Sequence, residues 1–461
     1  MSTNDTIAAI STPLGEGGIG VVRISGKQAF SVAEEMFVPH AEKRLADSDS
    51  HTAHHGYIAA PGTGEMVDEV LVTVMRSPKT YTAEDVVEIS CHGGIVPMKN
   101  ILGLCLSGGA RLAEPGEFTK RAFLNGRMDL AQAEAVLDII CSQTDASRKV
   151  AVQQLKGALS KEVMSLRSEV LEVLSLIEAS IDFSQEDIDL PEAEKVSSRV
   201  GATLSRITEM LKTSEKGMMM REGASIVICG RPNVGKSSLM NALLRHDRVI
   251  VTPVAGTTRD VIEESIILSG VKVKVSDTAG IIETSDRVEL EGIRRSREKL
   301  DTADIVIFVL DLSRDLTERD EEVFRTLEDK KIVIVANKAD LDQAFDLTDA
   351  SKRFSGRGIL KISALKKEGL ESIEDAVAKE LFDGEPEVPE GVMVTNMRHK
   401  DNLEKAAECL ERAADVTGKG YKPELLASDL KEAVDNLGLI TGETVEDDIL
   451  DKIFSQFCIG K

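Results

Sequence analysis

The chain has 461 residues, of which 42% are hydrophobic, and a formal net charge of −23 at pH 7. This length allows two to four domains, and no run of 18 or more apolar residues suggests a membrane span. The acidic charge argues against a protein that coats nucleic acid generally, because phosphate contacts need a basic surface. A local basic patch, or a partner that supplies positive charge, would still allow work on RNA.

The N-terminus and the cysteines indicate a cytoplasmic protein. Residues 1–6 lack the basic stretch and apolar core of a signal peptide. Six cysteines, at positions 91, 105, 141, 229, 409 and 458, show neither metal-ligand pairing nor disulfide-scaffold spacing. We therefore expect a reducing compartment.

The first 120 or so residues predict mixed strand and helix. Strands are expected at 19–24, 70–74 and 85–89, where β-branched runs are bounded by Gly or Pro or alternate in polarity. From Met128 to position 183 helix breakers are few and apolar residues recur at helical spacing. Pro191 ends that stretch, and a further helix is expected from about Glu192 to Gly217.

From Ala224 to Phe382 strands alternate with helices, which predicts a parallel-rich sheet wrapped by helices. Residues 384–391 read as a linker, and helices are expected at 403–416, 424–437 and 445–457. The helical regions before and after the sheet domain should pack together as one bundle, because each alone would expose an apolar stripe.

A phosphate-binding loop is predicted at Gly230-Arg-Pro-Asn-Val-Gly-Lys-Ser237, behind the apolar run 225–229. Its glycines let backbone N–H groups face phosphates, Lys236 supplies charge and Ser237 is a candidate Mg²⁺ ligand. The helix that begins at Ser238 adds its N-terminal dipole. The alternative, a simple Gly-rich turn, explains fewer of these features.

Two further segments are candidates for sensing the γ-phosphate. Thr258, in Gly256-Thr-Thr-Arg-Asp260, is the expected second Mg²⁺ ligand on a mobile loop, although this motif alone could be any polar loop. Asp277, in Asp277-Thr-Ala-Gly280, ends a strand at 271–275 and should reach the metal through water, and the Gly280 amide can meet the γ-phosphate.

The base-reading motif is Asn337-Lys338-Ala339-Asp340, after the strand-like run 331–335. The Asp340 carboxylate can accept hydrogen bonds from N1–H and the 2-amino group of guanine, a donor pair that adenine lacks. Ser363-Ala364, after a strand at 359–362, suits a backbone contact to the guanine carbonyl. We therefore predict GTP rather than ATP.

The residue after Asp277-Thr-Ala-Gly280 is Ile281, where many small GTPases place the glutamine that orients the attacking water. Another polar group must therefore orient the water during hydrolysis. Glu289, within Arg287-Val-Glu-Leu-Glu-Gly292, is the candidate catalytic residue. A solvated helix glutamate is the competing interpretation.

With these motifs, the chain resembles the tRNA-modification GTPases of the MnmE (TrmE) family over essentially its whole length. The resemblance depends on Gly17-Gly-Ile-Gly-Val-Val-Arg-Ile-Ser-Gly26, Tyr81-Thr-Ala-Glu-Asp-Val-Val-Glu88, Pro115-Gly-Glu-Phe-Thr-Lys-Arg-Ala-Phe-Leu-Asn-Gly126 and Phe457-Cys-Ile-Gly-Lys461, besides the GTPase motifs. It implies an α+β folate-binding and dimerising domain (1–122), a helical domain (123–218 and 385–461) and an inserted Ras-like P-loop GTPase domain (219–384).

The resemblance also implies a reaction. With the flavin- and NADH-using partner MnmG, the family adds an aminomethyl or carboxymethylaminomethyl group to C5 of the wobble uridine, position 34, of certain tRNAs. A tetrahydrofolate derivative, in its 5-formyl or 5,10-methylene form, supplies the one-carbon unit. A homodimer, a heterotetramer with MnmG and tRNA shared with MnmG are the implied assemblies, with no membrane.

By position, Arg23, Glu88, Arg127 and Lys461 are similar to the family's folate contacts. Arg127 stands where the family commonly has lysine, so charge is kept while reach and donor geometry differ. Asn233, Thr252, Val254 and Thr257 match the potassium ligands, Val254 through its backbone carbonyl. Potassium would then take the place of an arginine finger. Glu289 matches the catalytic glutamate, and Ile282 departs from a basic residue seen in some members.

The predicted GTP contacts form one set. They are Asn233, Val234, Gly235, Lys236, Ser237, Ser238, Thr252, Pro253, Val254, Ala255, Gly256, Thr257, Thr258, Asp277, Thr278, Ala279, Gly280, Asn337, Lys338, Asp340, Ser363 and Ala364.

Two weaker features have competing interpretations. Cys458 could be a nucleophile beside the folate site, but packing is favoured, and the last three residues do not fit a lipidation signal. His92-Gly-Gly94 faintly resembles an oxyanion loop, but no Gly-x-Ser-x-Gly accompanies it, so a tight turn is favoured.

Two other functions remain open. A ribosome-assembly factor could use GTP as a timer, and folate binding would distinguish it. A non-catalytic GTP-dependent dimerisation switch could leave all uridine chemistry to MnmG.

Overall fold

The computed structural model describes residues 5–40, 44–182, 193–246, 265–277, 300–382, 391–418 and 423–461. The chain divides into two compact units. One comprises Met1–Leu137 with Leu437–Lys461, and the other comprises Asp138–Asn436. The C-terminal residues thus belong to the same unit as the N-terminal sheet.

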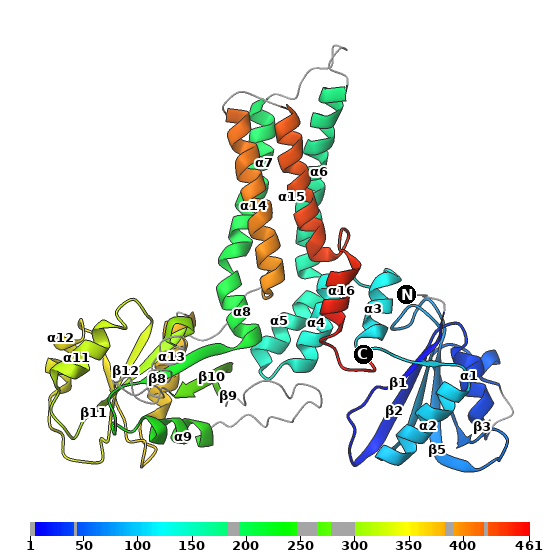
Figure 1. Cartoon of the computed structure of the whole chain (residues 1–461), viewed down its shortest axis with the longest axis horizontal. Helices are drawn as coiled ribbons and strands as arrows, with labels where there is room; N and C mark the ends of the chain where they lie inside the picture. Colours follow the sequence, from blue (N-terminus) through cyan, green and yellow to red (C-terminus); the bar gives the residue numbers. More distant parts are fainter. Residues whose placement is uncertain are drawn as a thin grey trace, which may run out of the picture. The chain divides into compact units, whose positions relative to one another are not determined.

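The first unit contains a seven-stranded sheet in the order β3-β4-β5-β6-β2-β1-β7. Figure 1 shows strands of this sheet in blue, the colour of the N-terminal residues. Its strands are β1 (Ile7–Ile10), β2 (Gly17–Ser25), β3 (Phe37–Pro39), β4 (Thr52–Ala59), β5 (Met66–Met75), β6 (Val86–Gly93) and β7 (Arg111–Leu112). Neighbouring strands are antiparallel, except that β7 runs parallel to β1. The strands predicted at 19–24 and 70–74 lie within β2 and β5, and the strand predicted at 85–89 overlaps β6 but begins one residue before it.

Helices α1 (Ala29–Met36) and α2 (Ile95–Ser107) pack on this sheet and bury its apolar side chains. The alternation is clear in β5, where Val70, Val72 and Val74 are buried and Leu71 is exposed. A short 3₁₀ helix spans Leu45–Asp47. A second cluster joins α3 (Glu117–Leu124), α4 (Leu130–Cys141) and α16 (Asp447–Phe454). The shared core explains why the two ends of the sequence fold together.

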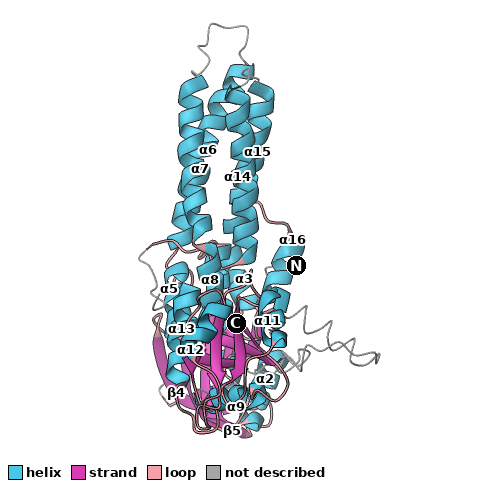
Figure 2. Ribbon diagram, turned by 90° about the vertical axis from the view of Figure 1, so that its left-hand side faces the viewer, coloured by secondary structure: helices cyan, strands magenta, loops and turns pink. Residues whose placement is uncertain are grey.

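The second unit carries the helices α5 (Asp145–Leu155), α6 (Ala158–Asp182), α7 (Ala193–Lys212), α8 (Ser214–Glu222), α14 (Met397–Gly418) and most of α15 (Pro423–Thr441). Helices α6, α7, α14 and α15 lie side by side (Figure 2), and α14 packs along α7. The prediction that the two helical regions form one bundle is confirmed. The single helix expected to Gly217 is wrong: it breaks at Thr213, whose hydroxyl oxygen accepts a hydrogen bond from the Val394 N–H at 3.2 Å.

A six-stranded sheet in the order β13-β12-β11-β8-β10-β9 forms the rest of this unit. Its strands are β8 (Ala224–Cys229), β9 (Ser265–Leu268), β10 (Val271–Asp277), β11 (Ile305–Asp311), β12 (Ile332–Asn337) and β13 (Ile359–Lys361). All neighbours are parallel except the β9–β10 hairpin, so the predicted parallel-rich sheet is confirmed.

Both faces of this sheet are covered, as a parallel sheet requires. Ile226 and Ile228 of β8 join the cluster under α9 (Lys236–His246) and α13 (Leu370–Phe382). Val227 and Cys229 join the opposite cluster, with α11 (Glu318–Arg325) and Phe354, which ends α12 (Leu347–Arg353). The carboxyl ends of β8, β10, β12 and β13 therefore meet at one edge, where ligands bind in such sheets. In the described part of the chain, no helix combines the length and apolarity needed to span a bilayer.

Candidate functional site

The phosphate loop connects β8 to α9, as predicted. Gly230 has φ +145°, and a Cβ there would lie 2.4 Å from the carbonyl oxygen of Val309. Gly235 has φ +98°, and its Cβ would lie 2.3 Å from Nδ2 of Asn337. The loop can therefore close on β11 and β12 only with glycine at these two places.

Lys236 begins α9 and is buried, and its Nζ donates to the carbonyl oxygens of Gly230 (3.0 Å) and Arg231 (2.9 Å). The ammonium group thus lies over the curled loop at a helix N-terminus, where a phosphate binds best. Ser237 and Ser238 lie exposed in the first turn of the helix. Buried Val234 anchors the loop, and the side chain of Asn233, at φ +65°, is exposed.

Arg231, which was not predicted as a site residue, ties the loop to α11. Its Nη1 donates to Asp320 Oδ2 at 2.9 Å and to Thr317 Oγ1 at 2.8 Å. Asp320 also caps α11 by accepting from the Thr317 N–H. The loop conformation is therefore held by a neighbouring helix cap, a role that no local sequence signal indicates.

Asn337 connects the phosphate loop with the loop after β13. Its Nδ2 donates to the Val234 carbonyl at 3.0 Å, and its Oδ1 accepts the Ala364 N–H at 3.0 Å. Asn337 is 2% exposed, so both polar atoms need these partners. The Ala364 N–H, predicted to contact a guanine carbonyl, serves Asn337 in this structure, and its guanine contact stays a prediction.

Lys338 connects the phosphate loop with the end of β11. Its Nζ contacts the Asn233 carbonyl at 2.9 Å and Asp311 Oδ2 at 2.5 Å. Burial by itself would raise the pKa of Asp311, but the hydrogen bonds from Lys338 and Ser313 lower that pKa below its ordinary value. The resulting charged pair fixes the Lys338 stem, whose backbone adopts φ +67°.

Asp340 lies partly exposed at this edge, with Ser363 Oγ donating to its Oδ1 at 2.5 Å. This hydrogen bond is the main reason that the pKa of Asp340 is lowered. The carboxylate therefore stays ionised at neutral pH and accepts hydrogen bonds, as recognition of a guanine N–H pair requires. The Ser363 hydroxyl orients Asp340, a role that was not predicted, and the predicted backbone contact of Ser363 to guanine stays a prediction.

We expect Ser363→Ala to raise the pKa of Asp340 toward its ordinary value, because the largest lowering contribution is removed. Base recognition needs the carboxylate, so it is complete above this pKa and is lost as pH falls through it. In the variant the loss should begin at higher pH. An NMR titration of the Asp340 side-chain carboxyl measures the pKa directly, and an unchanged value would contradict the assignment.

Gly235→Ala is expected to weaken nucleotide binding at least tenfold, because the new methyl group would overlap Nδ2 of Asn337 and the residue would keep an unfavourable positive φ. Gly270→Ala is the matched control: Gly270 has φ +79°, but no atom lies within 4 Å of its Cβ position. Fluorescent-nucleotide affinity measures both. Equal effects of the two substitutions would show that backbone strain alone, rather than the Asn337 contact, is responsible.

The structure describes few of the remaining residues that were predicted to bind the nucleotide or a metal ion. Asp277 is the last residue of β10, and only its backbone is described. Glu289 and the segments Thr252–Thr258 and Thr278–Gly280 lie outside the described residues. Of the predicted Mg²⁺ and K⁺ ligands, Ser237 and Asn233 are described with their side chains: Asn233 lies on the phosphate loop, and Ser237 lies in the first turn of α9.

The four predicted folate contacts come together in the first unit. Arg23 of β2 lies opposite Glu88 of β6, and its Nε and Nη2 approach Glu88 Oε1 at 2.8 and 2.7 Å. The Arg23 guanidinium carbon lies 5.4 Å from the ring centroid of Tyr81 and 5.6 Å from that of Phe118. These two rings hold the charged group in place.

Arg127 and Lys461 complete this cluster. The Arg127 guanidinium carbon lies 5.0 Å from the centroid of the same Tyr81 ring. The Phe118 N–H donates to the Lys461 carbonyl at 3.2 Å. Burial, followed by the charge of Arg23, lowers the pKa of the Lys461 ammonium group. Tyr81 was missed as a site residue, although two of the predicted arginines face its ring.

Gly460 allows the C-terminal segment to approach β1 closely. It adopts φ +94°, and a Cβ there would lie 2.3 Å from the Ile10 carbonyl oxygen. The Gly460 carbonyl accepts from Ser11 Oγ at 3.1 Å. This close approach brings Lys461 to β1 and β2.

Two weaker expectations are corrected. Cys458 is exposed rather than packed. His92 and Gly93 are the last residues of β6, and Gly94 is the N-cap of α2, so this segment is a strand-to-helix junction and not a tight turn. The His92 imidazole pairs with Asp68 at 2.6 Å, and this contact raises its pKa.

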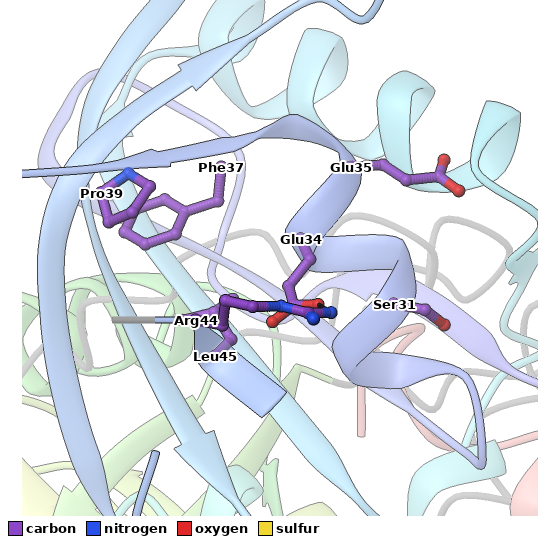
Figure 3. Close-up of a pocket in the computed structure, with 7 residues that line it drawn as sticks. All are labelled: Ser31, Glu34, Glu35, Phe37, Pro39, Arg44 and Leu45. Atoms are coloured by element: carbon purple, nitrogen blue, oxygen red, sulfur yellow. Dashed lines mark hydrogen bonds and ion pairs between the residues drawn. The ribbon is translucent and has the colours of Figure 1, made fainter. Parts of the chain in front are cut away.

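A hollow of about 600 Å³ in the first unit is lined by Ser31, Glu34, Glu35, Phe37, Pro39, Arg44 and Leu45 (Figure 3). Arg44 Nη2 lies 3.1 Å from Glu34 Oε2, and the Ala46 N–H donates to Glu34 Oε1. None of the lining residues is a predicted site residue. The hollow is open, and Arg44 and Glu34 in its lining pair with each other, so we assign it no function.

The glycine-dependent phosphate loop, the buried Asn337 and the ionised Asp340 on one sheet edge define a P-loop GTPase. Two family models match the chain: the GTP-binding protein TrmE N-terminus over residues 6–127 and the MnmE helical domain over residues 130–458. The tRNA modification GTPase MnmE of Alkaliphilus oremlandii is 46% identical over 461 residues, which is 100% of both chains. That of Carboxydothermus hydrogenoformans is 47% identical over 99% of both.

Among solved structures, an Aquifex aeolicus Era variant bound to GDP and aluminium fluoride matches 40% of this chain and 66% of its own, with 29% identity and a TM-score of 0.30. The full-length relatives and the two family models decide the assignment. The chain belongs to the tRNA modification GTPase MnmE family.

Proposed function

We propose that this chain hydrolyses GTP to drive tRNA modification in the cytoplasm. With MnmG it would transfer a tetrahydrofolate one-carbon unit toward C5 of the wobble uridine and so add an aminomethyl or carboxymethylaminomethyl group. The observation that supports this most is a cluster in which Arg23 pairs with Glu88, shares the Tyr81 ring with Arg127 and lies near Lys461. A GTPase that acted only as a timer would have no need of this cluster.

The chemistry of the cluster suits a folate. The Glu88 carboxylate can accept hydrogen bonds from the N–H groups of a pterin ring, and its contact with Arg23 orients that carboxylate. The cationic side chains of Arg127 and Lys461 suit the anionic glutamate tail, and the face of Tyr81 suits a planar ring. A tetrahydrofolate in its 5-formyl or 5,10-methylene form would supply the one-carbon unit.

In the nucleotide site, Lys236 would contact the β and γ phosphates, and Ser237, with Thr258, would hold Mg²⁺. Asn233, with Thr252, Val254 and Thr257, would hold K⁺. These cations, when bound, supply positive charge against the charge that develops on the phosphates. Glu289 would orient the attacking water, since Ile281 has no polar atom to do so.

Folate binding tests this proposal. We expect Arg23→Ala to weaken binding of 5-formyltetrahydrofolate by roughly 10–100-fold, the effect of losing a charge-assisted contact of about 1.5–3 kcal/mol. Arg76→Ala is the matched control, because Arg76 also lies over a ring, that of Phe30 at 4.7 Å, but outside the cluster. Calorimetry on the full chain measures both. Absence of folate binding by the unsubstituted chain would favour the ribosome-assembly alternative.

The potassium site is tested separately. GTP hydrolysis should be faster in K⁺ than in Na⁺, and Asn233→Ala should abolish the difference. Equal rates of the unsubstituted chain in both ions would contradict the assignment.

The catalytic role of Glu289 is tested by measuring both GTP turnover and tRNA modification in cells. Glu289→Ala should stop GTP turnover and leave hypomodified wobble uridine in cellular tRNA. Full modification despite lost turnover would support the dimerisation-switch alternative.

The proposed assembly is a homodimer that forms a heterotetramer with MnmG and shares tRNA with it. Light scattering after gel filtration, with and without MnmG, measures both masses. A monomeric chain would contradict this part of the proposal.

A further inference from the structure

Two histidines and a glutamate meet on the exposed face of strands β3, β4 and β5, away from the folate residues in the sheet order. His40, His55 and Glu69 each offer a ligand atom, and these atoms all lie within 4.8 Å of one another. Among the residues that the structure describes, no other group of three His, Cys, Asp or Glu side chains converges in this way.

The strand register brings these residues together. Pro39 pairs with Gly56, and the next residue, His40, donates its N–H to the His55 carbonyl at 3.1 Å. Tyr57 pairs with Glu69, so Glu69 is a diagonal neighbour of His55 on the same face. Backbone pairing across three strands, rather than flexible loops, therefore sets the spacing.

Side-chain contacts orient the group further. His55 Nε2 lies 2.8 Å from Glu69 Oε1. The His40 ring lies 4.5 Å from the His55 ring and meets the Tyr57 ring edge-on at 4.9 Å, measured between centroids. Tyr57 and His55 thus confine the His40 ring, which reduces the entropy lost on binding an ion.

We propose that His40, His55 and Glu69 bind Zn²⁺, with a fourth position open to water or to another ligand. Two imidazole nitrogens and one carboxylate suit this ion, whereas Mg²⁺ prefers oxygen ligands alone. The neutral tautomer of His55 with its proton on Nδ1 presents the Nε2 lone pair. The Glu69 carboxylate and a net charge of −23 favour a cation at this surface.

The required movement is small. Metal–ligand distances of about 2.0–2.2 Å place tetrahedral ligand atoms roughly 3.3–3.5 Å apart. The His55–Glu69 pair must open slightly, and separations of up to 4.8 Å must close. The side chains of His55 and Glu69 are 51% and 50% exposed, so rotation about their χ angles can achieve this without repacking the core.

A bound ion would join three strands at one end of the sheet. Such binding stabilises the folded unit in proportion to the logarithm of ion concentration over Kd. This consequence is independent of GTP and of folate, so failure of the proposed function would leave the zinc proposal standing, and the reverse also holds.

The test is a Zn²⁺ titration of the full, nucleotide-free chain against a coloured chelator, in excess Mg²⁺. We expect one Zn²⁺ per chain, and at least tenfold weaker binding in His55→Ala, His40→Ala and Glu69→Gln. His51→Asn is the matched control: His51 is an exposed histidine at φ +63°, a conformation that asparagine tolerates, and it is not in the group. Co²⁺ should give the visible absorption of a tetrahedral site, which the three variants lose.

Thermal unfolding supplies a second measurement. Zn²⁺ should raise the transition temperature of the unsubstituted chain and of His51→Asn but not of the three ligand variants, and Glu69→Gln keeps nearly the same shape if an alanine variant folds poorly. No stoichiometric Zn²⁺ uptake, or equal affinity in Glu69→Gln and the unsubstituted chain, would overturn the proposal.

Discussion

Asp340→Asn is expected to lower the affinity for GTP by roughly 10²–10⁴-fold, the loss of two charge-assisted hydrogen bonds of about 1.5–3 kcal/mol each. The same substitution should create affinity for xanthosine triphosphate, because xanthine carries a carbonyl oxygen where guanine carries the 2-amino group. An asparagine amide can donate to that oxygen, whereas the aspartate carboxylate cannot. Competition against a fluorescent nucleotide measures both affinities.

The contacts of Asp340 indicate that its substitution changes base recognition without changing the orientation of the side chain. Ser363 Oγ holds one carboxylate oxygen at 2.5 Å, and a hydroxyl can also donate to an amide oxygen, so the orientation should survive in the variant. Asp342→Asn, two residues along and exposed, is the matched control and should leave both affinities unchanged. Similar losses of GTP affinity in the two variants, or no gain for the xanthine nucleotide, would contradict the role given to Asp340.

Arg121→Met is expected to destabilise the first unit by roughly 3–5 kcal/mol, the cost of removing one partner from a buried ion pair. Arg121 is 4% exposed and contacts Asp5 at 2.6 Å, Glu117 at 2.9 Å and Glu84 at 3.2 Å. Methionine fills similar space but leaves Glu117 and Asp5 with Arg111 as their cationic partner, and the Arg111 side chain is 40% exposed. Hydrogen exchange of β1 and β6 amides in the full chain measures local stability.

The stability lost in Arg121→Met should depend on pH in a direction that the pKa of Glu117 determines. Burial by itself would raise the pKa of Glu117, but hydrogen bonds from Arg111, the Glu114 N–H and Arg121 lower it below its ordinary value. A carboxyl with a lowered folded-state pKa stabilises above its unfolded-state pKa, and this stabilisation is lost as pH falls through the folded-state value. Without Arg121 the carboxylates ionise less readily, so the deficit of the variant should widen as pH rises toward 7.

Arg44→Met is the control for this experiment. Arg44 also pairs with a glutamate of the first unit, Glu34 at 3.1 Å, but its side chain is 73% exposed. Exposed pairs contribute at most about 1 kcal/mol. Comparable effects of the two substitutions would show that the buried network does not stabilise the sheet.

Local periodicity and motifs were sufficient to predict most strands of this protein and several residues of its nucleotide site. The β-branched runs became β2, β5, β6, β8 and β10, because β-branched side chains that alternate or follow one another pack well on a sheet. The glycines of the phosphate loop and the carboxylate of Asp340 could be assigned from chemistry alone. The single helix expected to reach Gly217 is divided at Thr213, whose side chain accepts a hydrogen bond from the distant residue Val394, a contact that local sequence does not indicate.

Only the tertiary structure decided which distant groups meet. Nothing in the local sequence of Arg231 indicates its pairing with the cap of α11, and nothing near Tyr81 indicates that Arg23 and Arg127 share its ring. The His40, His55 and Glu69 group likewise arises from strand register. Sequence patterns specify helices, strands and motif-bearing loops such as the phosphate loop, because these depend on neighbours a few residues away. Contacts across strands depend on register and packing, which the whole fold sets.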